Sequence, residues 1–329
     1  MDNQRLLWAD QTKGIGIFLM IYAHNFPIFE YYIYTFHMPL FFFVAGMFHP
    51  KKGGFNNVTK RAKTILIPYF VWSLVLYLFW LFIGRHYGDS ANMELSPLNN
   101  FIGVFYAQGD NAFMNWGIPM WFLPCIFVTF CLYTFIRTFP KQITQIAISI
   151  VLICLGFLYS HLFTFKLPWS IDVACVSLSF YVAGFYLKDV IKNLKFKHIL
   201  ICLLVIFILQ FSFAFLNSSK VDMYRSIYGN QLLFVLNGLS GTLMVILVFK
   251  LFKFPNFIAY VGKHTLVLLA LHGRALTCIK LFLVVVGLSV LSFNELTKFV
   301  FAVLQCVLIV PAIWLVNKYI PILDGNIKK

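Results

Sequence analysis

Long apolar runs separated by short polar segments recur from one end of the chain to the other. A membrane-spanning helix needs about 20 mostly apolar residues, because a helix rises about 1.5 Å per residue and the hydrocarbon core is about 30 Å thick. About ten runs meet this condition, so the pattern predicts an all-α, polytopic membrane protein. The second run is short, and the ninth is interrupted by His272, Gly273 and Arg274. The predicted spans are 14–32, 34–49, 64–84, 118–137, 143–160, 170–187, 198–216, 230–249, 264–288 and 299–317.

The composition agrees with this class and excludes several others. Of the 329 residues, 61% are apolar and only 11% are charged, whereas an ordinary soluble domain is about 25% charged. A water-soluble enzyme, a disordered chain, a secreted disulfide scaffold and a nucleic-acid binder are therefore excluded. The seven cysteines lie in apolar runs without CxxC pairs or metal-ligand spacing, which predicts small buried side chains and no metal site.

The Lys and Arg residues are distributed unevenly between the two ends of the predicted spans. The formal net charge of +15, taken alone, would suggest a nucleic-acid partner, but the cations cluster in short segments between spans, such as 51–63 and 188–197. If the N-terminus is cytoplasmic, 18 of the 26 Lys and Arg lie in cytoplasmic segments, 5 in outer segments and 3 within spans. Because cationic loops stay cytoplasmic, this bias predicts that both termini are cytoplasmic. Asp10 and Lys13 stand where the apolar part of a signal peptide would begin, so we expect the first span to be retained.

Ionisable residues inside a span are candidates for function, because each costs about 2.5–3.5 kcal/mol on insertion scales. Lys13 and His24 are eleven positions apart. At about 100° per residue this spacing puts them on one helix face, about 16 Å apart along the axis. A cation at the cytoplasmic mouth can hold the phosphates of coenzyme A, while a histidine at mid-helix meets the thioester. The alternative is a snorkelling lysine and a histidine that hydrogen-bonds a neighbouring helix.

A second histidine favours the chemical interpretation of the first span. His37 lies near the outer end of the second predicted span, which a tight turn joins to the first. Two histidines on adjacent antiparallel helices can face one cavity, whereas a lone histidine more often forms local hydrogen bonds.

The longest outer segment, about 85–117, mixes aromatic and carboxylate side chains. It holds Trp116 together with Asp89, Glu94 and Asp110. Such side chains stack on sugars and hydrogen-bond to them, although an aromatic belt at the membrane interface has the same composition. The sequence leaves both interpretations open.

Several short segments follow one another in an order that is typical of one enzyme family. They are Trp8-x-Asp10-x-x-Lys13-Gly14 with His24, the FHMPLFFF-x-x-G run from Phe36 to Gly46, Lys60-Arg61 with Ile67-Pro68-Tyr69, the PMWFLP run from Pro119 to Pro124, and His264-Thr265-Leu266 with Leu271-His272-Gly273. In these residues the chain resembles the acyltransferase 3 family of integral membrane O-acyltransferases, in particular the branch that acetylates surface polysaccharides and O-antigens. The resemblance covers about residues 8–273. The family frequently has arginine where this chain has Lys13, which supplies a point charge for phosphate but no bidentate fork.

The resemblance implies a single membrane acyltransferase domain over residues 1–329, located in the bacterial cytoplasmic (inner) membrane. It implies transfer of an acetyl group from cytoplasmic acetyl-CoA, the co-substrate, to a hydroxyl of a surface glycan or lipid-linked glycan at the outer face. We expect His24 to act as general base, with His37 and Asn25 orienting it or stabilising the oxyanion. Lys13 and Arg61 are expected to bind the CoA phosphates. Direct transfer and an acyl-histidine intermediate both remain open.

Five further residues have two interpretations each. His272 and Arg274 either line the path of CoA or form structural hydrogen bonds. Glu30, six positions and about 240° past His24 on a continuous helix, either contacts the acceptor or is solvated. Trp116 and Trp121 either bind the acceptor or belong to the aromatic belt and the core. Solvated positions without a role are expected for His49, His86, His161 and His198.

Two other functions remain compatible with the sequence. A transporter or flippase of a lipid-linked sugar would use the same cavity without chemistry, although we see no matching pair of broken spans in two halves of the chain. The other is an acyltransferase that acts on peptidoglycan or a lipid. Membrane lipids are expected partners in each case, nucleic acid is not, and the sequence leaves open whether the protein is a homo-oligomer.

Overall fold

The computed structural model describes residues 6–51, 54–86, 88–217, 219–288 and 294–326. Four cations of the charge count, Arg5, Lys52, Lys328 and Lys329, lie outside the described residues, as does the side chain of Asp89. The helices are α1 (Leu7–Ala23), α2 (Glu30–Tyr34), α3 (His37–Met47), α4 (Phe55–Phe82), α5 (Pro97–Tyr106), α6 (Asn111–Met114), α7 (Phe122–Ile136), α8 (Gln142–Leu162), α9 (Ile171–Asn193), α10 (Phe196–Leu216), α11 (Gln231–Leu251), α12 (Asn256–Lys263), α13 (Thr265–Val285) and α14 (Glu295–Tyr319). Short 3₁₀ turns are η1 (Gly84–His86), η2 (Gly88–Asn92), η3 (Ile118–Trp121), η4 (Pro168–Ser170), η5 (Met223–Arg225) and η6 (Pro321–Asp324).

Eight helices in the described part of the chain are long and apolar enough to cross a membrane. They are α4, α7 with η3, α8, α9 with η4, α10, α11, α13 and α14. The first two predicted spans correspond to α1 and α3, which are shorter, at 17 and 11 residues. The predicted class, an all-α polytopic membrane protein, is confirmed, while the count of about ten spans and the cytoplasmic placement of both termini stay predictions.

The ninth predicted span forms one continuous helix, although polar residues interrupt its apolar run. Helix α13 runs without a break through His272, Gly273 and Arg274. A single glycine in a helix costs only about 1 kcal/mol, which the surrounding apolar helix tolerates. The expectation of buried cysteines is wrong for Cys154 and Cys278, which are exposed on α8 and α13.

The chain divides into two compact units, each formed from segments that are distant in sequence. Unit 1 comprises Met1–Phe48, Ala183–Val221 and Tyr228–Ile313, and unit 2 comprises His49–Val182, Asp222–Ile227 and Trp314–Lys329. Unit 1 therefore contains α1 to α3, the second part of α9, α10 to α13 and most of α14. Unit 2 contains α4 to α8 and the first part of α9.

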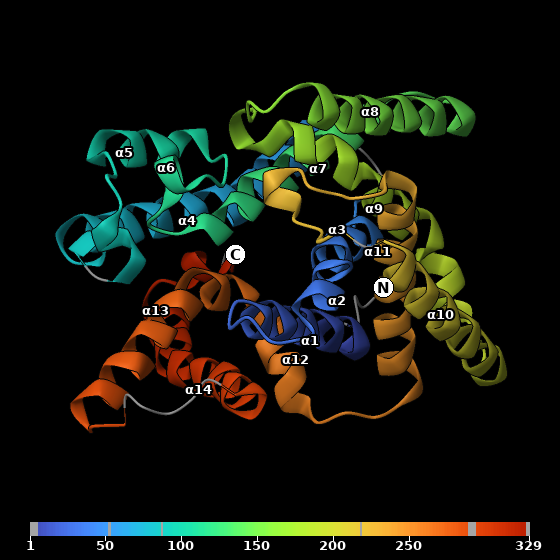
Figure 1. The fold of residues 1–329 in the computed structure, drawn as a ribbon. Helices are drawn as coiled ribbons and strands as arrows, with labels where there is room; N and C mark the ends of the chain where they lie inside the picture. The colour runs from blue at the N-terminus through green and yellow to red at the C-terminus, as the bar shows by residue number, and fades with distance from the viewer. Residues whose placement is uncertain (1–5, 52–53, 87, 218, 289–293, 327–329) are drawn as a thin grey trace. The chain divides into compact units, whose positions relative to one another are not determined.

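In unit 1, α1 packs closely along α12, as Figure 1 shows. Two glycines make this approach possible. A Cβ atom on Gly14 would lie 2.0 Å from the carbonyl oxygen of Ile258, and one on Gly262 would lie 1.7 Å from that of Asp10. Only glycine permits backbones at this distance, so the glycine of the opening motif is required by helix packing.

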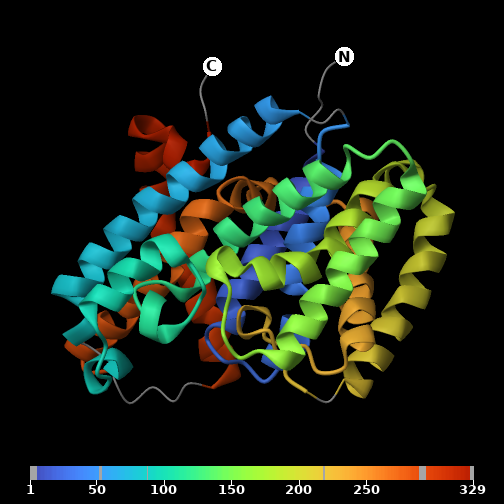
Figure 2. The same cartoon turned by 90° about the horizontal axis from the view of Figure 1, so that it is seen from above.

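The core of unit 1 continues between α3 and α11. Phe36, Leu40 and Val44 follow one face of α3 and pack against Val245 and Phe249 of α11. Helix α10 lies beside α11 in both views (Figures 1 and 2). Helix α1 also contacts α3 and α11, so the segment after α1 enters a closely packed environment.

Unit 2 is organised around α4, which packs on α7 and on η6. Tyr69 of α4 donates a hydrogen bond to the carbonyl of Val104 at 2.8 Å, and Trp72 donates to that of Leu323 at 3.0 Å. Helix α5 packs on α4, and α6 packs on α5 (Figure 1). Tyr69 thus attaches α5 to α4, and Trp72 attaches η6 to α4.

Candidate active site

His24 lies directly after α1, because the helix ends at Ala23. The expected span 14–32, with His24 at mid-helix, is wrong. Pro27 disfavours helical geometry at the residue before it. Phe26 adopts a left-handed conformation with φ of 54°, which reverses the chain before α2. The turn presents His24 and Asn25 at a helix end, where their side chains can reach neighbouring helices.

The imidazole of His24 pairs with that of His272 from α13. Nδ1 of His24 lies 3.0 Å from Nε2 of His272, and the two ring planes differ by only 16°. Nδ1 of His272 lies 2.9 Å from the carbonyl oxygen of Leu269, one turn earlier on the same helix. The two histidines are 248 positions apart in sequence.

This arrangement assigns the hydrogens of both rings. A carbonyl oxygen only accepts, so Nδ1 of His272 carries a hydrogen, and in a neutral ring its Nε2 is then an acceptor. Nδ1 of His24 must therefore donate to His272, which leaves the lone pair of Nε2 on His24 directed away from the pair. A histidine held in one tautomer by a second group is the arrangement that a general base requires.

Gln305 of α14 braces His272 and Asn25, the residue that follows His24. Its Nε2 donates to the backbone carbonyl of His272 at 2.9 Å, and its Oε1 accepts from Nδ2 of Asn25 at 2.9 Å. Nδ2 of Asn25 also donates to the backbone carbonyl of Lys298 at 3.1 Å. Gln305 is fully buried. Gln305 was not identified from the sequence, because only ionisable residues within spans were taken as candidates. A lone amide side chain in an apolar span also indicates a buried polar contact.

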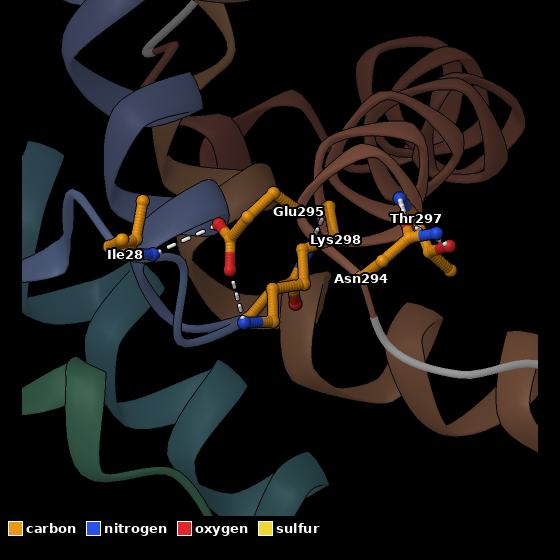
Figure 3. A network of polar contacts seen from close by, with 6 residues as sticks. Ile28, Asn294, Glu295, Thr297 and Lys298 are labelled. Carbon is orange, nitrogen blue, oxygen red and sulfur yellow. Dashed lines mark hydrogen bonds and ion pairs between the residues drawn. The ribbon is translucent and has the colours of Figure 1, made fainter.

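The start of α14 also holds the turn that follows His24. Figure 3 shows the carboxylate of Glu295 between the backbone N–H of Ile28, at 2.9 Å, and the ammonium of Lys298, at 2.7 Å. Together with the Asn25 contacts, these bonds attach residues 25–28 to α14 at two points. The position of His24 is therefore fixed from both α13 and α14.

His37 and Asn25 do not make the orienting contact to His24 that the sequence predicts for them. Nδ1 of His37 lies 2.9 Å from the carbonyl of Ile33, and its ring contacts that of Tyr34 at a centroid distance of 4.9 Å. Both hydrogens of the Asn25 amide group are donated to α14, as described above. The ring that contacts His24 is that of His272, for which the sequence left a CoA-lining role and a structural hydrogen bond open.

Glu30 is buried in an ion pair with Lys220, which contradicts the solvated alternative. The helical angle of 240° between His24 and Glu30 does not apply either, since α1 ends before His24. Lys220 follows α10, and its ammonium lies over the rings of Tyr31, at 5.5 Å, and Tyr34, at 5.0 Å. The sequence gave Lys220 no role because it lies in a short loop.

Lys13 is ion-paired on its own helix. Its ammonium lies 2.8 Å from the carboxylate of Asp10, which is buried, while the Lys13 side chain keeps partial exposure. The aspartate of the opening motif thus compensates the charge of the lysine. Arg274, two positions after His272 on a regular helix, projects about 200° away from it and so lies on the opposite face of α13 from the histidine pair.

Arg61 lies in unit 2, in a buried cluster that the sequence did not predict. Its guanidinium lies 5.9 Å from the ring centroid of Phe130 on α7, and its Nε has no partner among the described residues. His49, expected to be solvated, is buried beside Phe130 and hydrogen-bonds the hydroxyl of Tyr181 at 2.9 Å. Its position directly after an apolar span suggested exposure, but the aromatic residues of α7 and α9 cover it.

Trp116 and Trp121, also in unit 2, offer no exposed ring face for stacking. Trp116 is 0% exposed, and its indole N–H donates to the carbonyl of Asn100 at 2.9 Å. Trp121 is 4% exposed and contacts Phe122. The core interpretation therefore describes both side chains in this structure, and aromatic contacts to an acceptor must come from elsewhere.

Comparison with known proteins gives one match. The model of the acyltransferase domain family Acyl_transf_3 matches residues 6–318, which is nearly the whole chain. Neither a curated protein nor a solved structure matches the chain.

Proposed function

Because the chain belongs to the acyltransferase 3 family, we propose that it moves an acetyl group from cytoplasmic acetyl-CoA to a hydroxyl of a surface glycan. The acceptor is an O-antigen, a capsule or another exopolysaccharide, and the reaction takes place at the outer face of the bacterial inner membrane. Family membership supports the acyl transfer. The proposed identities of the acetyl donor and the glycan acceptor are based on two features of the sequence. These are the family branch that the motifs resemble and the cationic segments between spans.

The observation that carries the chemical part of this proposal is the hydrogen bond from Nδ1 of His24 to Nε2 of His272. It leaves Nε2 of His24 able to accept the proton of an acceptor hydroxyl. As the proton moves to Nε2, the hydroxyl oxygen bonds to the thioester carbonyl carbon and forms a tetrahedral intermediate. The intermediate then expels the CoA thiolate by breaking the carbon–sulfur bond, and the His24 imidazolium returns the proton to sulfur.

His272 would orient His24 without supplying a negative charge. In a serine protease triad a carboxylate both fixes the histidine tautomer and stabilises the imidazolium. A neutral imidazole accepts the same hydrogen bond but gives less electrostatic stabilisation. The base is thus held in one tautomer, and its affinity for the proton is raised less than a carboxylate would raise it.

Lys13 of unit 1 and Arg61 of unit 2 are each proposed to bind phosphate groups of CoA. For Arg61 the supporting observation is its unpartnered Nε, a donor that a phosphate oxygen would satisfy. For Lys13 the support is its partly exposed ammonium, although Asp10 already compensates part of the charge. We expect Arg61 to contribute more, because guanidinium binds phosphate through two parallel hydrogen bonds.

The test uses membranes that contain the full chain, labelled acetyl-CoA and surface glycan from the host cell. The unmodified protein should form base-labile acetyl ester on the glycan, and His24→Ala should lose it at unchanged expression. His161→Ala, which removes an exposed histidine on α8, is the matched control and should keep full activity. Ester formation by His24→Ala at a near-normal rate would defeat the assignment of the base. A glycan that crosses the membrane unmodified and without acetyl-CoA would instead favour a transporter.

A further inference from the structure

A polar and aromatic cluster is formed by α2, the helix that follows the His24 turn, and the proposed mechanism does not use it. Glu30 and Tyr31 open α2, Tyr34 ends it, and Lys220 reaches them from the segment after α10. All four residues belong to unit 1. We call them the α2 cluster.

Anchoring of the loop does not explain the ion pair in this cluster. The segment after α10 is already held by Asn217, whose Nδ2 donates to the carbonyl of Tyr228 and whose Oδ1 accepts the backbone N–H of Asn230. Burying the carboxylate of Glu30 removes its hydration, which the ion pair must offset. A charge pair that costs desolvation and is not needed for anchoring is a candidate for ligand binding.

The cluster combines the two surfaces that bind a sugar ring. Tyr31 is 58% exposed, so its ring has a free face for the apolar C–H face of a pyranose. Lys220, with 35% of its side chain exposed, offers ammonium hydrogens, and the Glu30 carboxylate offers acceptor lone pairs. Neighbouring hydroxyls on a sugar ring both donate and accept, so one such pair can bind two of them.

The cluster is also adjacent to the reacting groups. The Tyr34 ring contacts that of His37 at a centroid distance of 4.9 Å, and α2 begins at Glu30, six positions after His24. A sugar held against Tyr31 and Lys220 would therefore have a hydroxyl near His24. The buried Trp116 and Trp121 cannot provide a stacking surface of this kind.

Resting on the proposed function, we propose that Glu30, Tyr31, Tyr34 and Lys220 form the subsite for a neutral sugar residue of the acceptor. Glu30 already balances the charge of Lys220. A phosphate or a uronic acid would have to displace that carboxylate and leave it buried without a partner, which is costly. An uncharged sugar hydrogen-bonds to both groups and keeps the pair intact.

The test is saturation-transfer difference NMR on the detergent-solubilised full chain, with methyl β-glucoside and methyl β-galactoside as neutral probes. Methyl β-glucuronide is the acidic probe, and inorganic phosphate is added as a competitor. We expect transfer to the ring protons of at least one neutral glycoside, which phosphate does not displace. Tyr31→Ala should weaken this binding about three- to tenfold, as expected for loss of one aromatic contact.

Two further variants separate ligand binding from folding. Tyr319→Ala removes another exposed tyrosine, at the end of α14, and should leave the transfer unchanged. The double variant Glu30→Gln with Lys220→Gln removes both charges together, so that neither is left buried alone, and should also weaken neutral-sugar binding. Because Tyr31 is exposed, Tyr31→Ala leaves the fold intact even if the double variant does not fold.

Three results would overturn the proposal: no transfer to either neutral glycoside, equal binding by Tyr31→Ala and the unmodified protein, or preferential binding of glucuronide or phosphate. None of these measurements requires acetyl transfer, so their failure is distinct from failure of the proposed function. In the transfer assay, Tyr31→Ala should raise the KM for glycan without raising the KM for acetyl-CoA. A variant that only disturbs an interfacial aromatic belt would change neither quantity.

Discussion

Substitution of His272 tests whether this residue holds His24 in the reactive tautomer. His272→Leu removes the acceptor for Nδ1–H of His24 and leaves a buried donor unpaired, which costs about 1–3 kcal/mol. If this cost falls on the transition state, kcat should drop about 5- to 150-fold. The effect should be smaller than the roughly 10⁴-fold loss that follows disruption of a triad carboxylate, because His272 is neutral.

Two amide variants of His272 differ mainly in reach. In His272→Gln the side-chain oxygen can take the place of Nε2 and accept from His24. In His272→Asn the amide reaches only the place of Nδ1, near the carbonyl of Leu269, and the bond to His24 is lost. We therefore expect the glutamine variant to keep most of its kcat and the asparagine variant to fall to the level of leucine.

The assay is the initial rate of labelled acetyl ester formation at varied acetyl-CoA and varied glycan concentrations. The loss should appear in kcat with little change in either KM, since His272 contacts His24 and not a substrate. Expression and a monodisperse elution profile in detergent establish that each variant folds. Equal activity of the glutamine and asparagine variants, or a leucine variant as fast as the unmodified protein, would refute the orienting role.

Predictions for four further variants follow from contacts within unit 1. Gln305→Leu leaves the amide of Asn25 without its side-chain partner and should lower the free energy of unfolding by about 1–3 kcal/mol, as measured by denaturant titration. An unchanged denaturation midpoint would show that the hydrogen bond between Gln305 and Asn25 does not stabilise the protein. Gly262→Ala should destabilise the protein by about 1–3 kcal/mol or more, because its Cβ would lie 1.7 Å from the Asp10 carbonyl oxygen. Gly273→Ala adds a Cβ with no atom within 4 Å, so it should be neutral or stabilising by up to about 1 kcal/mol. The Gly262→Ala variant should therefore melt at a lower temperature than the Gly273→Ala variant, and the reverse order would contradict the close α1–α12 packing. Lys13→Ala should raise the KM for acetyl-CoA and leave the KM for glycan unchanged, and an effect on glycan alone would contradict its place at the donor phosphates.

The local sequence pattern was sufficient to predict the long helices and to identify the family. Eight of the predicted spans recur as long apolar helices, because the length and hydropathy of a span depend only on neighbouring residues and on membrane thickness. The motif around His24 likewise depends on residues that are close in sequence. Pro27 is a local sign that α1 ends at Ala23. The apolar residues around Pro27 were the stronger signal and favoured a longer span.

Only the tertiary structure decided which polar groups meet. His24 and His272 are 248 positions apart, Glu30 and Lys220 are 190, and Asn25 and Gln305 are 280. No periodicity in the sequence specifies such pairs, because they depend on which helix faces pack together. Packing also buried Trp116 and His49, which the sequence placed at a surface. Hydropathy along a chain is a local property and predicts the helices, whereas the orientation of the His24 side chain is set by hydrogen bonds that form only after distant helices have packed.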